Sequence, residues 1–190
     1  MKTNMAAECM NECFPIKPSN SRTPRNCKYF IPLKAVRDTE KILLEYARKK
    51  TANEGLVYWG GIENGNIVSV GVVIAPKTKS GPGGVFTSRR ANFDFVRTLS
   101  THQFVQIAQV HSHPSDWVEH SSGDDMLAVF KVEGLLSIVV PSYCQKGMLP
   151  LTICGIHRYE KQGFMQLSRT YVLSHFAVKS DITSYLEDFR

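Results

Sequence analysis

The sequence has no long apolar run. No segment approaches the roughly eighteen consecutive apolar residues that a membrane-spanning helix needs, and residues 1–8 lack the apolar core of a secretory signal. We therefore expect a cytoplasmic protein with no membrane partner. The formal net charge is +6, but the lysines and arginines are scattered and form no basic run, so nucleic acid is not an expected partner.

Cysteines are few, and their number is odd: the chain has five. Cys9, Cys13 and Cys27 lie in the N-terminal segment without a histidine, at a spacing that matches no familiar zinc finger, so we expect no structural zinc site there. Cys144 and Cys154 lie near apolar runs. This pattern favours reduced thiols over a disulfide framework.

What the chain has is the composition of an ordinary globular protein, with 43% hydrophobic and 21% charged residues. A length of 190 residues favours one domain with a sizeable core. We expect an N-terminal arm over residues 1–37, extended or poorly ordered over 1–28, because prolines and polar residues recur there. A domain over 38–168 and a C-terminal extension over 169–190, packed on the domain, complete the prediction.

Periodicity and turn residues predict alternating helices and strands. The expected helices cover 39–52, capped by Asp38 or Thr39, and 91–100, with Phe93, Val96 and Leu99 in the core. The expected strands are 56–59 and 67–74, joined by a turn at 63–66, then 135–140, 151–156 and 164–167. The glycine-rich loop 76–88 is either a substrate flap or a plain connector, and the tail 170–190 is a strand or a short helix. This order predicts an α/β sandwich with a central mixed sheet flanked by helices.

One stretch carries most of the chemistry: His111-Ser112-His113-Pro114, followed by Ser121-Ser122-Gly123-Asp124. An alternating apolar run over 104–110 predicts a core strand that leads into the histidines, and Pro114 ends it. Because residues two apart on a strand point the same way, His111 and His113 can aim both imidazoles at one point. A helix through 126–130, capped by Ser121 or Ser122, would place Asp124 in its first turn.

These side chains have the chemistry of a metal site. Two neutral imidazoles and one carboxylate leave a fourth position free for water, which is typical of a catalytic zinc site rather than a closed structural one. This ligand set suits zinc better than the other common divalent ions. We therefore expect one Zn²⁺ per chain, bound by His111, His113 and Asp124.

The spacing resembles the signature of the JAMM (MPN+, Mov34/JAB) metalloproteases, which is His-x-His, seven residues, Ser, two residues, Asp. Counted from His113, this pattern falls on Ser121 and Asp124. Ser122 and Asp125 are second choices, since they require a loop that is one residue longer. The resemblance covers about residues 38–168 and implies the JAMM fold, a cytidine-deaminase-like α/β sandwich.

The resemblance also implies a glutamate near the start of the first core strand. The run Asn53-Glu54-Gly55-Leu56-Val57-Tyr58-Trp59-Gly60-Gly61 is similar to the Glu-x-x-Gly-x-Leu-x-Gly run of prokaryotic JAB proteins, although the glycine spacing differs. Glu54 is the best placed carboxylate, and Glu63 in the 63–66 turn is the alternative. Glu40 and Glu45, on the preceding helix, are expected to be surface charges.

Roles for these residues follow from the family. Glu54 would act as general base toward a zinc-activated water. The hydroxyl of Ser121 would donate a hydrogen bond to the oxygen on which negative charge develops. The same hydroxyl has an alternative role as the helix N-cap.

The resemblance implies a zinc-dependent isopeptidase or peptidase that cuts after the C-terminal glycines of ubiquitin or a ubiquitin-like modifier. The compact bacterial JAB forms are most similar to the 54–59 run, and many accompany ubiquitin-like conjugation systems, including those of antiphage defence operons. The expected partner is therefore a ubiquitin-like protein or its conjugate, with loop 76–88 as a candidate to hold the substrate tail. The alternatives are a RadC-like protein linked to DNA, a hydrolase of sulfur-carrier adducts, and a metal-free MPN scaffold.

Overall fold

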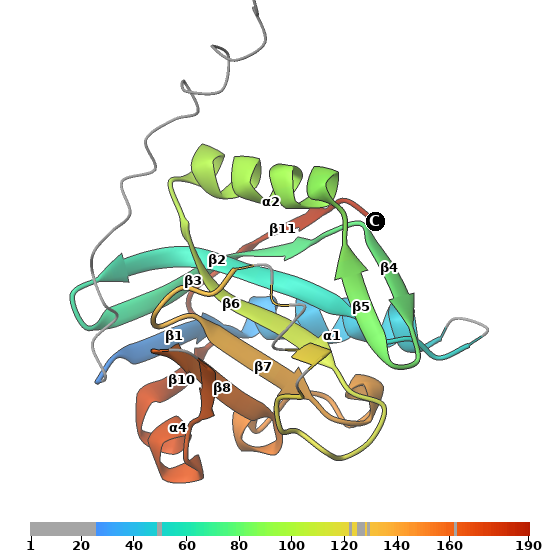
Figure 1. The fold of residues 1–190 in the computed structure, drawn as a ribbon. Coiled ribbons are helices and arrows are strands. Elements are labelled where there is room, and N and C mark those ends of the chain that lie inside the picture. Colours follow the sequence, from blue (N-terminus) through green and yellow to red (C-terminus); the bar gives the residue numbers. More distant parts are fainter. Residues whose placement is uncertain (1–25, 49–50, 122, 125–127, 129, 162) are drawn as a thin grey trace, which may run out of the picture.

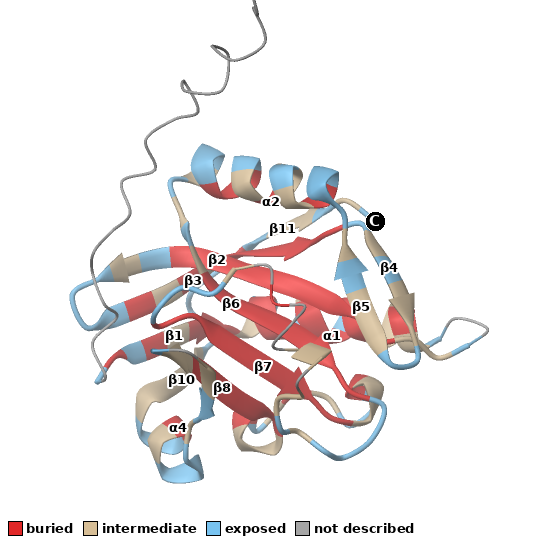
Figure 2. Ribbon diagram, in the orientation of Figure 1, coloured by how far each residue is buried: buried red, intermediate tan, exposed pale blue. Residues whose placement is uncertain are grey.

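The computed structural model describes residues 26–48, 51–121, 123, 124, 128, 130–161 and 163–190 (Figure 1). Its central strands are buried on both faces (Figure 2). Strand β2 (Leu56–Asn64) pairs antiparallel with β3 (Ile67–Ala75) and with β6 (Val105–Ser112). Because successive side chains of a strand point to opposite faces, Val57 and Trp59 join one hydrophobic cluster while Leu56 and Tyr58 join another.

The main sheet is curled and mixed and has nine described strands, in the order β10-β1-β3-β2-β6-β7-β8-β9, with β11 also paired to β3. The strands not yet given are β1 (Lys28–Pro32), β7 (Leu136–Val140), β8 (Gly155–Glu160), β9 (Gly163–Gln166), β10 (Phe176–Lys179) and β11 (Tyr185–Asp188). The β6–β7 pair is parallel, and so are the pairs β1–β10, β1–β3 and β11–β3. The pairs β7–β8 and β8–β9 are antiparallel.

Helices cover the sheet on both faces. Helix α1 (Leu33–Ala47) packs on the Trp59 side, where the Trp59 indole N–H donates to the Thr39 hydroxyl over 2.9 Å. Helix α2 (Arg89–His102) covers the other side (Figure 1). Its Phe95 ring packs against Tyr58 in a tilted arrangement, with ring centroids 4.4 Å apart. The shorter elements are α4 (Arg169–His175), the 3-10 turns η1 (Ser142–Cys144) and η2 (Leu151–Ile153), and a separate hairpin of β4 (Thr78–Gly81) and β5 (Gly84–Thr87). The chain thus has a mixed α/β architecture.

The N-terminal boundary of the fold lies earlier than predicted. Strand β1 pairs with β3 and β10, and α1 begins at Leu33 rather than at 39, so residues 28–37 belong to the fold and not to an arm. The predicted cap Thr39 lies buried inside the helix, where its hydroxyl donates to the Ala35 carbonyl over 2.8 Å. An intrahelical acceptor of this kind satisfies a threonine as well as a cap does. The predicted arm over 1–25 lies outside the described residues.

The C-terminal half departs from prediction in two places. The strand predicted at 151–156 is wrong, because Leu151–Ile153 form η2 after Pro150 and the strand begins only at Gly155. The tail contains both a helix and strands: α4 leads into β10 and β11, which pair in the main sheet. The C-terminal segment is therefore part of the sheet. The loop predicted at 76–88 contains the β4–β5 hairpin.

Two side chains occupy environments opposite to those predicted. Phe93 on α2 is 60% exposed, whereas Phe95 and Leu99 face the core. Glu40, predicted on the surface, is buried and accepts a hydrogen bond from the Met148 backbone N–H over 2.8 Å. Arg37 donates to its other oxygen over 2.8 Å, so the buried charge is paired. Helical periodicity alone did not reveal the loop that closes over this carboxylate.

The helix predicted through 126–130 falls mainly outside the described residues. Within them, the Ala128 N–H donates to the Asp124 carbonyl over 2.9 Å, as in one helical turn, and Phe130 is not helical. The described cysteines Cys27, Cys144 and Cys154 are buried free thiols. In the part of the chain that the structure describes, no helix has the length and apolar character required to cross a membrane.

Candidate metal centre

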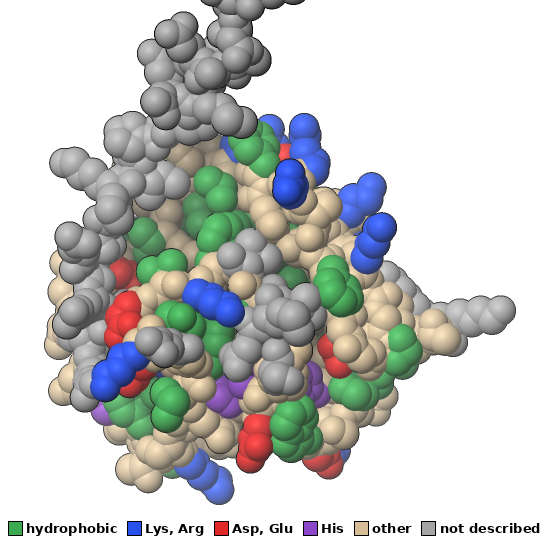
Figure 3. Space-filling model, viewed as in Figure 1, with side chains coloured by type: hydrophobic (Ala, Val, Ile, Leu, Met, Phe, Trp, Pro, Cys, Tyr) green, Lys and Arg blue, Asp and Glu red, His purple; other side chains and the backbone are tan. Residues whose placement is uncertain are grey.

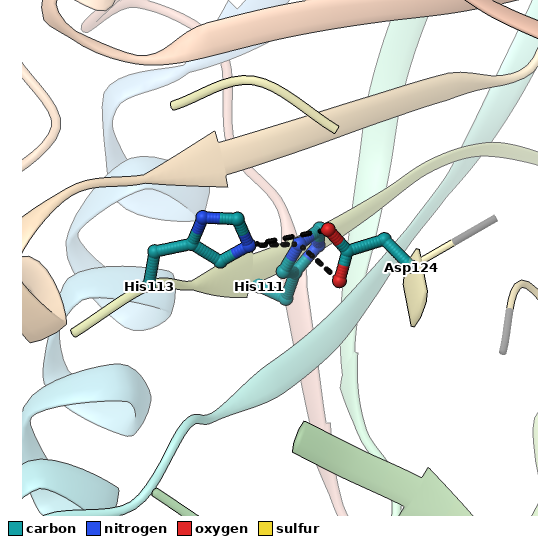
Figure 4. Close-up of side chains that lie close together, drawn as sticks. All are labelled: His111, His113 and Asp124. Atoms are coloured by element: carbon teal, nitrogen blue, oxygen red, sulfur yellow. Dashed lines mark hydrogen bonds and ion pairs between the residues drawn. The ribbon is translucent and has the colours of Figure 1, made fainter. Parts of the chain in front are cut away.

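His111 and His113 leave the end of β6 with their side chains converging (Figure 4). Their Nε2 atoms are 3.3 Å apart, and both residues are buried. The backbone beyond the strand is fixed on both sides of His113: its N–H donates to the Val140 carbonyl over 2.9 Å, and its carbonyl accepts from the Tyr143 N–H over 2.7 Å. Pro114 follows directly, so the predicted end of the strand is confirmed.

Asp124 completes the cluster from a segment that is distant from β6 along the chain (Figure 4). One carboxylate oxygen lies 3.3 Å from Nε2 of His111, and the other lies 3.3 Å from Nε2 of His113. In the described part of the chain, no other group of three His, Cys, Asp or Glu side chains brings its ligand atoms this close together. The structure therefore brings together the three residues predicted to bind a metal.

The spacing of the donor atoms suits a zinc ion. Ligands at about 2.0–2.1 Å from a tetrahedral zinc are separated from one another by about 3.3–3.4 Å. The two Nε2 atoms are 3.3 Å apart, which matches such a separation, and each of them lies 3.3 Å from a different oxygen of the Asp124 carboxylate. Two imidazoles and one carboxylate also form a common catalytic zinc set, in which the remaining corner is left for water or substrate.

Charges in the cluster are strongly coupled. Burial by itself would raise the pKa of Asp124, but hydrogen bonds from His111 and His113 hold that pKa far below its usual range. Burial would lower the pKa of His113, yet the carboxylate of Asp124 raises it overall. The carboxylate is thus ionised, and a bound cation would also stabilise this charge.

Neighbouring groups orient the ligands. Nδ1 of His113 lies 3.0 Å from the Trp117 carbonyl oxygen, to which it donates, so loss of the Nε2 proton would leave a lone pair facing the cluster. The Trp117 ring also stacks on His113, with centroids 5.4 Å apart. Ser121 donates to Asp124 from its backbone N–H and from its hydroxyl, each over 2.8 Å. The second choices, Ser122 and Asp125, lie outside the described residues.

Glu54 lies on the same side of the sheet end as the cluster. It precedes Leu56, which is the register partner of His111, and its own N–H donates to the Gly81 carbonyl over 3.0 Å. Burial raises the pKa of Glu54 to about 7, with a lowering contribution from His113 and a raising one from Asp124. Its neighbour Gly55 is anchored to Ser112, the residue between the two histidines, by hydrogen bonds of 3.0 and 3.1 Å.

Glu63, the alternative base, lies at the opposite end of β2. It pairs with Val68, whereas the His111 partner Leu56 begins the strand. Seven residues of extended chain separate positions 56 and 63, or about 23 Å at 3.3 Å per residue. The structure therefore brings Glu54, and not Glu63, to the candidate metal ligands.

Sequence reasoning missed a group of polar side chains beside the cluster. Gln109, Ser137 and His157 are register partners across β6, β7 and β8, and His120 lies against them. Burial, and next the nearby His120, lower the pKa of His157 to about 4, so it is neutral at pH 7. Gln109 and Ser137 interrupt apolar strand runs, and this interruption is the signal that would have revealed them.

A cleft opens beside the ligands, between the sheet and the β4–β5 hairpin. It spans about 400 Å³ including space that is open to solvent, and polar and apolar residues contribute to its lining in about equal measure. Its lining consists of Leu56, Tyr58, Val85, Thr87, Gln109, His111, Asp124 and Ala128. On the face drawn in Figure 3, histidine side chains reach the surface over small areas, and Lys and Arg side chains are scattered, with several over α2.

Comparison with known proteins identifies the fold but no family. No protein-family model and no curated protein matches the sequence. The structure is similar to the solution structure of protein DSY2949 from Desulfitobacterium hafniense, a structural genomics target. The sequences are 19% identical, the TM-score is 0.57, and the match covers 81% of this chain and 94% of that chain. At this identity the likeness concerns the fold alone.

Proposed function

We propose that this chain is a zinc-dependent peptidase of the JAMM type, with a JAMM fold, which cleaves after the C-terminus of a ubiquitin-like modifier. The observation that carries the proposal is the cluster of His111, His113 and Asp124 beside the buried carboxyl group of Glu54. In this cluster the two Nε2 atoms lie 3.3 Å apart, and each lies 3.3 Å from one oxygen of the carboxylate. The motif spacing in the sequence supports the same assignment.

The residues divide the chemistry between them. His111, His113 and Asp124 would hold the ion, which when bound supplies a Lewis acid that acidifies water to a pKa of about 7 and polarises a carbonyl. Glu54 accepts the proton of the attacking water and transfers it to the leaving amine. A pKa of about 7 suits both steps, because a group that titrates near the working pH can accept and donate protons.

Ser121 contributes mainly through Asp124 in this arrangement. Its hydroxyl proton is directed to the Asp124 carboxylate, and the same oxygen accepts from the Asp124 N–H over 3.0 Å. These bonds support a role in orienting a ligand and capping the turn. A role in stabilising the oxyanion remains a prediction, and it would require the hydroxyl to turn toward the substrate.

The cleft supports a thin, extended substrate. Val85 and Thr87 of β5 line it opposite Leu56 and Tyr58 of β2. Within the described residues β5 pairs with β4 alone, so its other edge is available to an extended peptide that adds as a strand. A glycine-rich tail suits this arrangement, because it carries no side chains that need pockets.

Elemental analysis of the purified protein tests the proposal at its first step. We expect about one zinc per chain in the parent, and loss of the zinc in His113→Ala and Asp124→Ala. His102→Ala is the matched control, since His102 contacts Phe104 and Tyr185 away from the cluster. A parent that binds no zinc after metal-replete purification would overturn the proposal and favour a scaffold. A zinc-loaded parent would next be tested on linear fusions of ubiquitin-like proteins, with a chelator control.

A further inference from the structure

His120 lies directly beside the ligand His111. Their rings are nearly perpendicular, at 83°, with centroids 6.0 Å apart. On its other sides His120 stacks on Phe164 of β9 at 4.4 Å and meets His157 of β8 at 5.4 Å. The ring is thus packed between the candidate metal ligand and two strands at the edge of the sheet.

A short hydrogen-bond chain fixes this ring. The side-chain amide of Gln109 donates to the Ser137 hydroxyl oxygen over 3.1 Å, and Nε2 of His120 lies 2.9 Å from the same oxygen. A serine hydroxyl has one proton to donate. The same hydroxyl can accept a second hydrogen bond or donate its own proton, so it can hold Nε2 of His120 in either tautomer of the imidazole.

Two paired, buried strands of the main sheet anchor this hydrogen-bond chain. Gln109 lies two residues before His111 on β6, so both side chains point to the same face. Its register partner Ser137 on β7 is fully buried. The position of the His120 ring is therefore set by β6, which carries His111, and by its neighbour β7.

We propose that His120 is a positioning residue, which holds the His111 imidazole in its metal-binding orientation through the chain Gln109–Ser137–His120. The inference rests on the proposed metal site and adds a residue that the motif does not contain. His113 is oriented by a direct hydrogen bond to the Trp117 carbonyl. His111 is oriented instead by packing against a ring that is itself hydrogen-bonded.

The test compares three variants of the full chain. His120→Phe keeps an aromatic ring but loses the bond to Ser137, His120→Gln can keep that bond but loses the ring, and Ser137→Ala removes the partner alone. The zinc dissociation constant is measured by competition with a chromogenic chelator, and the cobalt-substituted proteins are compared by visible absorption. The unfolding midpoint of each metal-free protein reports folding separately.

We expect zinc to bind about 10-fold more weakly in His120→Phe and His120→Gln, as for other outer-shell residues, with a changed cobalt spectrum and a metal-free midpoint near that of the parent. The double variant His120→Gln/Ser137→Ala should lose less zinc-binding free energy than the sum of the two single losses. Both substitutions act through the same hydrogen-bond chain, so their effects are not additive. His102→Ala should bind as the parent does. If the His120 variants keep the zinc affinity and the cobalt spectrum of the parent, the role of His120 is overturned and the proposed function is not. A parent that binds no zinc would overturn the proposed function itself.

Discussion

Ser121 and Asp124 are joined by reciprocal hydrogen bonds. The Asp124 carboxylate accepts from the N–H and the hydroxyl of Ser121, and the Asp124 N–H donates back to the Ser121 oxygen over 3.0 Å. This is the geometry of a capping box, with aspartate in the third position after the cap. The same pair of residues therefore begins a turn of the backbone and aims a carboxylate at two histidines.

Ser121→Ala should impair both roles. Loss of the cap costs about 1 kcal/mol of unfolding free energy, and loss of an oriented ligand weakens zinc binding by about 10-fold. Urea unfolding of the metal-free protein and chelator competition measure the two effects. Ser121→Thr keeps the hydroxyl and should remain close to the parent in both. If the alanine variant binds zinc as tightly as the parent, these hydrogen bonds do not orient the carboxylate.

Gly155 allows the loop that carries Trp117 to lie against β8. A Cβ at this position would lie 1.8 Å from the Val118 carbonyl oxygen, so Gly155→Ala must displace that backbone. Because the adjacent Trp117 carbonyl holds His113, the variant should lose about 1–3 kcal/mol of unfolding free energy and bind zinc more weakly.

Gly163→Ala is the control for this substitution, since no atom lies within 4 Å of the added Cβ. Zinc titration and chemical denaturation of both variants test the prediction. Equal behaviour of the two variants would show that the loop tolerates the displacement and does not fix His113.

Gln103 ends α2 with a left-handed backbone, at φ 54° and ψ 36°. Such a conformation favours glycine, because a Cβ meets the following carbonyl there at a cost of about 1–2 kcal/mol. Gln103→Gly should therefore be about 1 kcal/mol more stable than Gln103→Ala in urea unfolding. The side chain is exposed, so little packing is lost in either variant. A more stable alanine variant would contradict this assignment of strain.

The ligands could be predicted from the sequence because their placement depends on local rules. Two histidines separated by one residue at the end of a strand must point to the same side, and Pro114 marks that end. The β2–β3 hairpin and helix α2 could be predicted for the same reason, because each depends on a pattern within a short stretch of the sequence. Glu54 could be placed through the family resemblance and not from any local rule.

The remaining features depend on contacts between distant segments. Strand β1 is short and lies in a region of mixed composition, and it becomes a strand only by pairing with β3 and β10. Glu40 is buried because the Met148 loop closes over it. His120 has no periodic signal, since it lies in a loop whose path is set by Gly155 and the sheet edge. Such positions are decided by tertiary packing, which a single sequence does not display.

Glu54→Gln should separate metal binding from catalysis. The amide is nearly isosteric but cannot accept a proton, so the variant should retain zinc and lose hydrolysis of a ubiquitin-like fusion by about 10²-fold or more. Glu63→Gln, which removes the same charge from the far end of β2, should cleave as the parent does. Normal cleavage by the Glu54 variant would exclude this residue as the general base and leave the proton transfer to another group.

Glu54 also predicts how the stability of the metal-free protein depends on pH. Its pKa in the folded state is about 7, above the ordinary value of 4.5, so folding favours the protonated carboxyl. This stabilising contribution is fully present below about pH 4.5 and is lost as the pH rises through about 7. With a chelator present, the unfolding free energy of the parent should therefore fall relative to that of Glu54→Gln between pH 5 and 8. The other titrating groups are the same in both proteins, so their contributions largely cancel in this difference. Parallel curves for the two proteins would mean that the buried carboxyl keeps its ordinary pKa, and a base that titrates near neutrality would have to be found elsewhere.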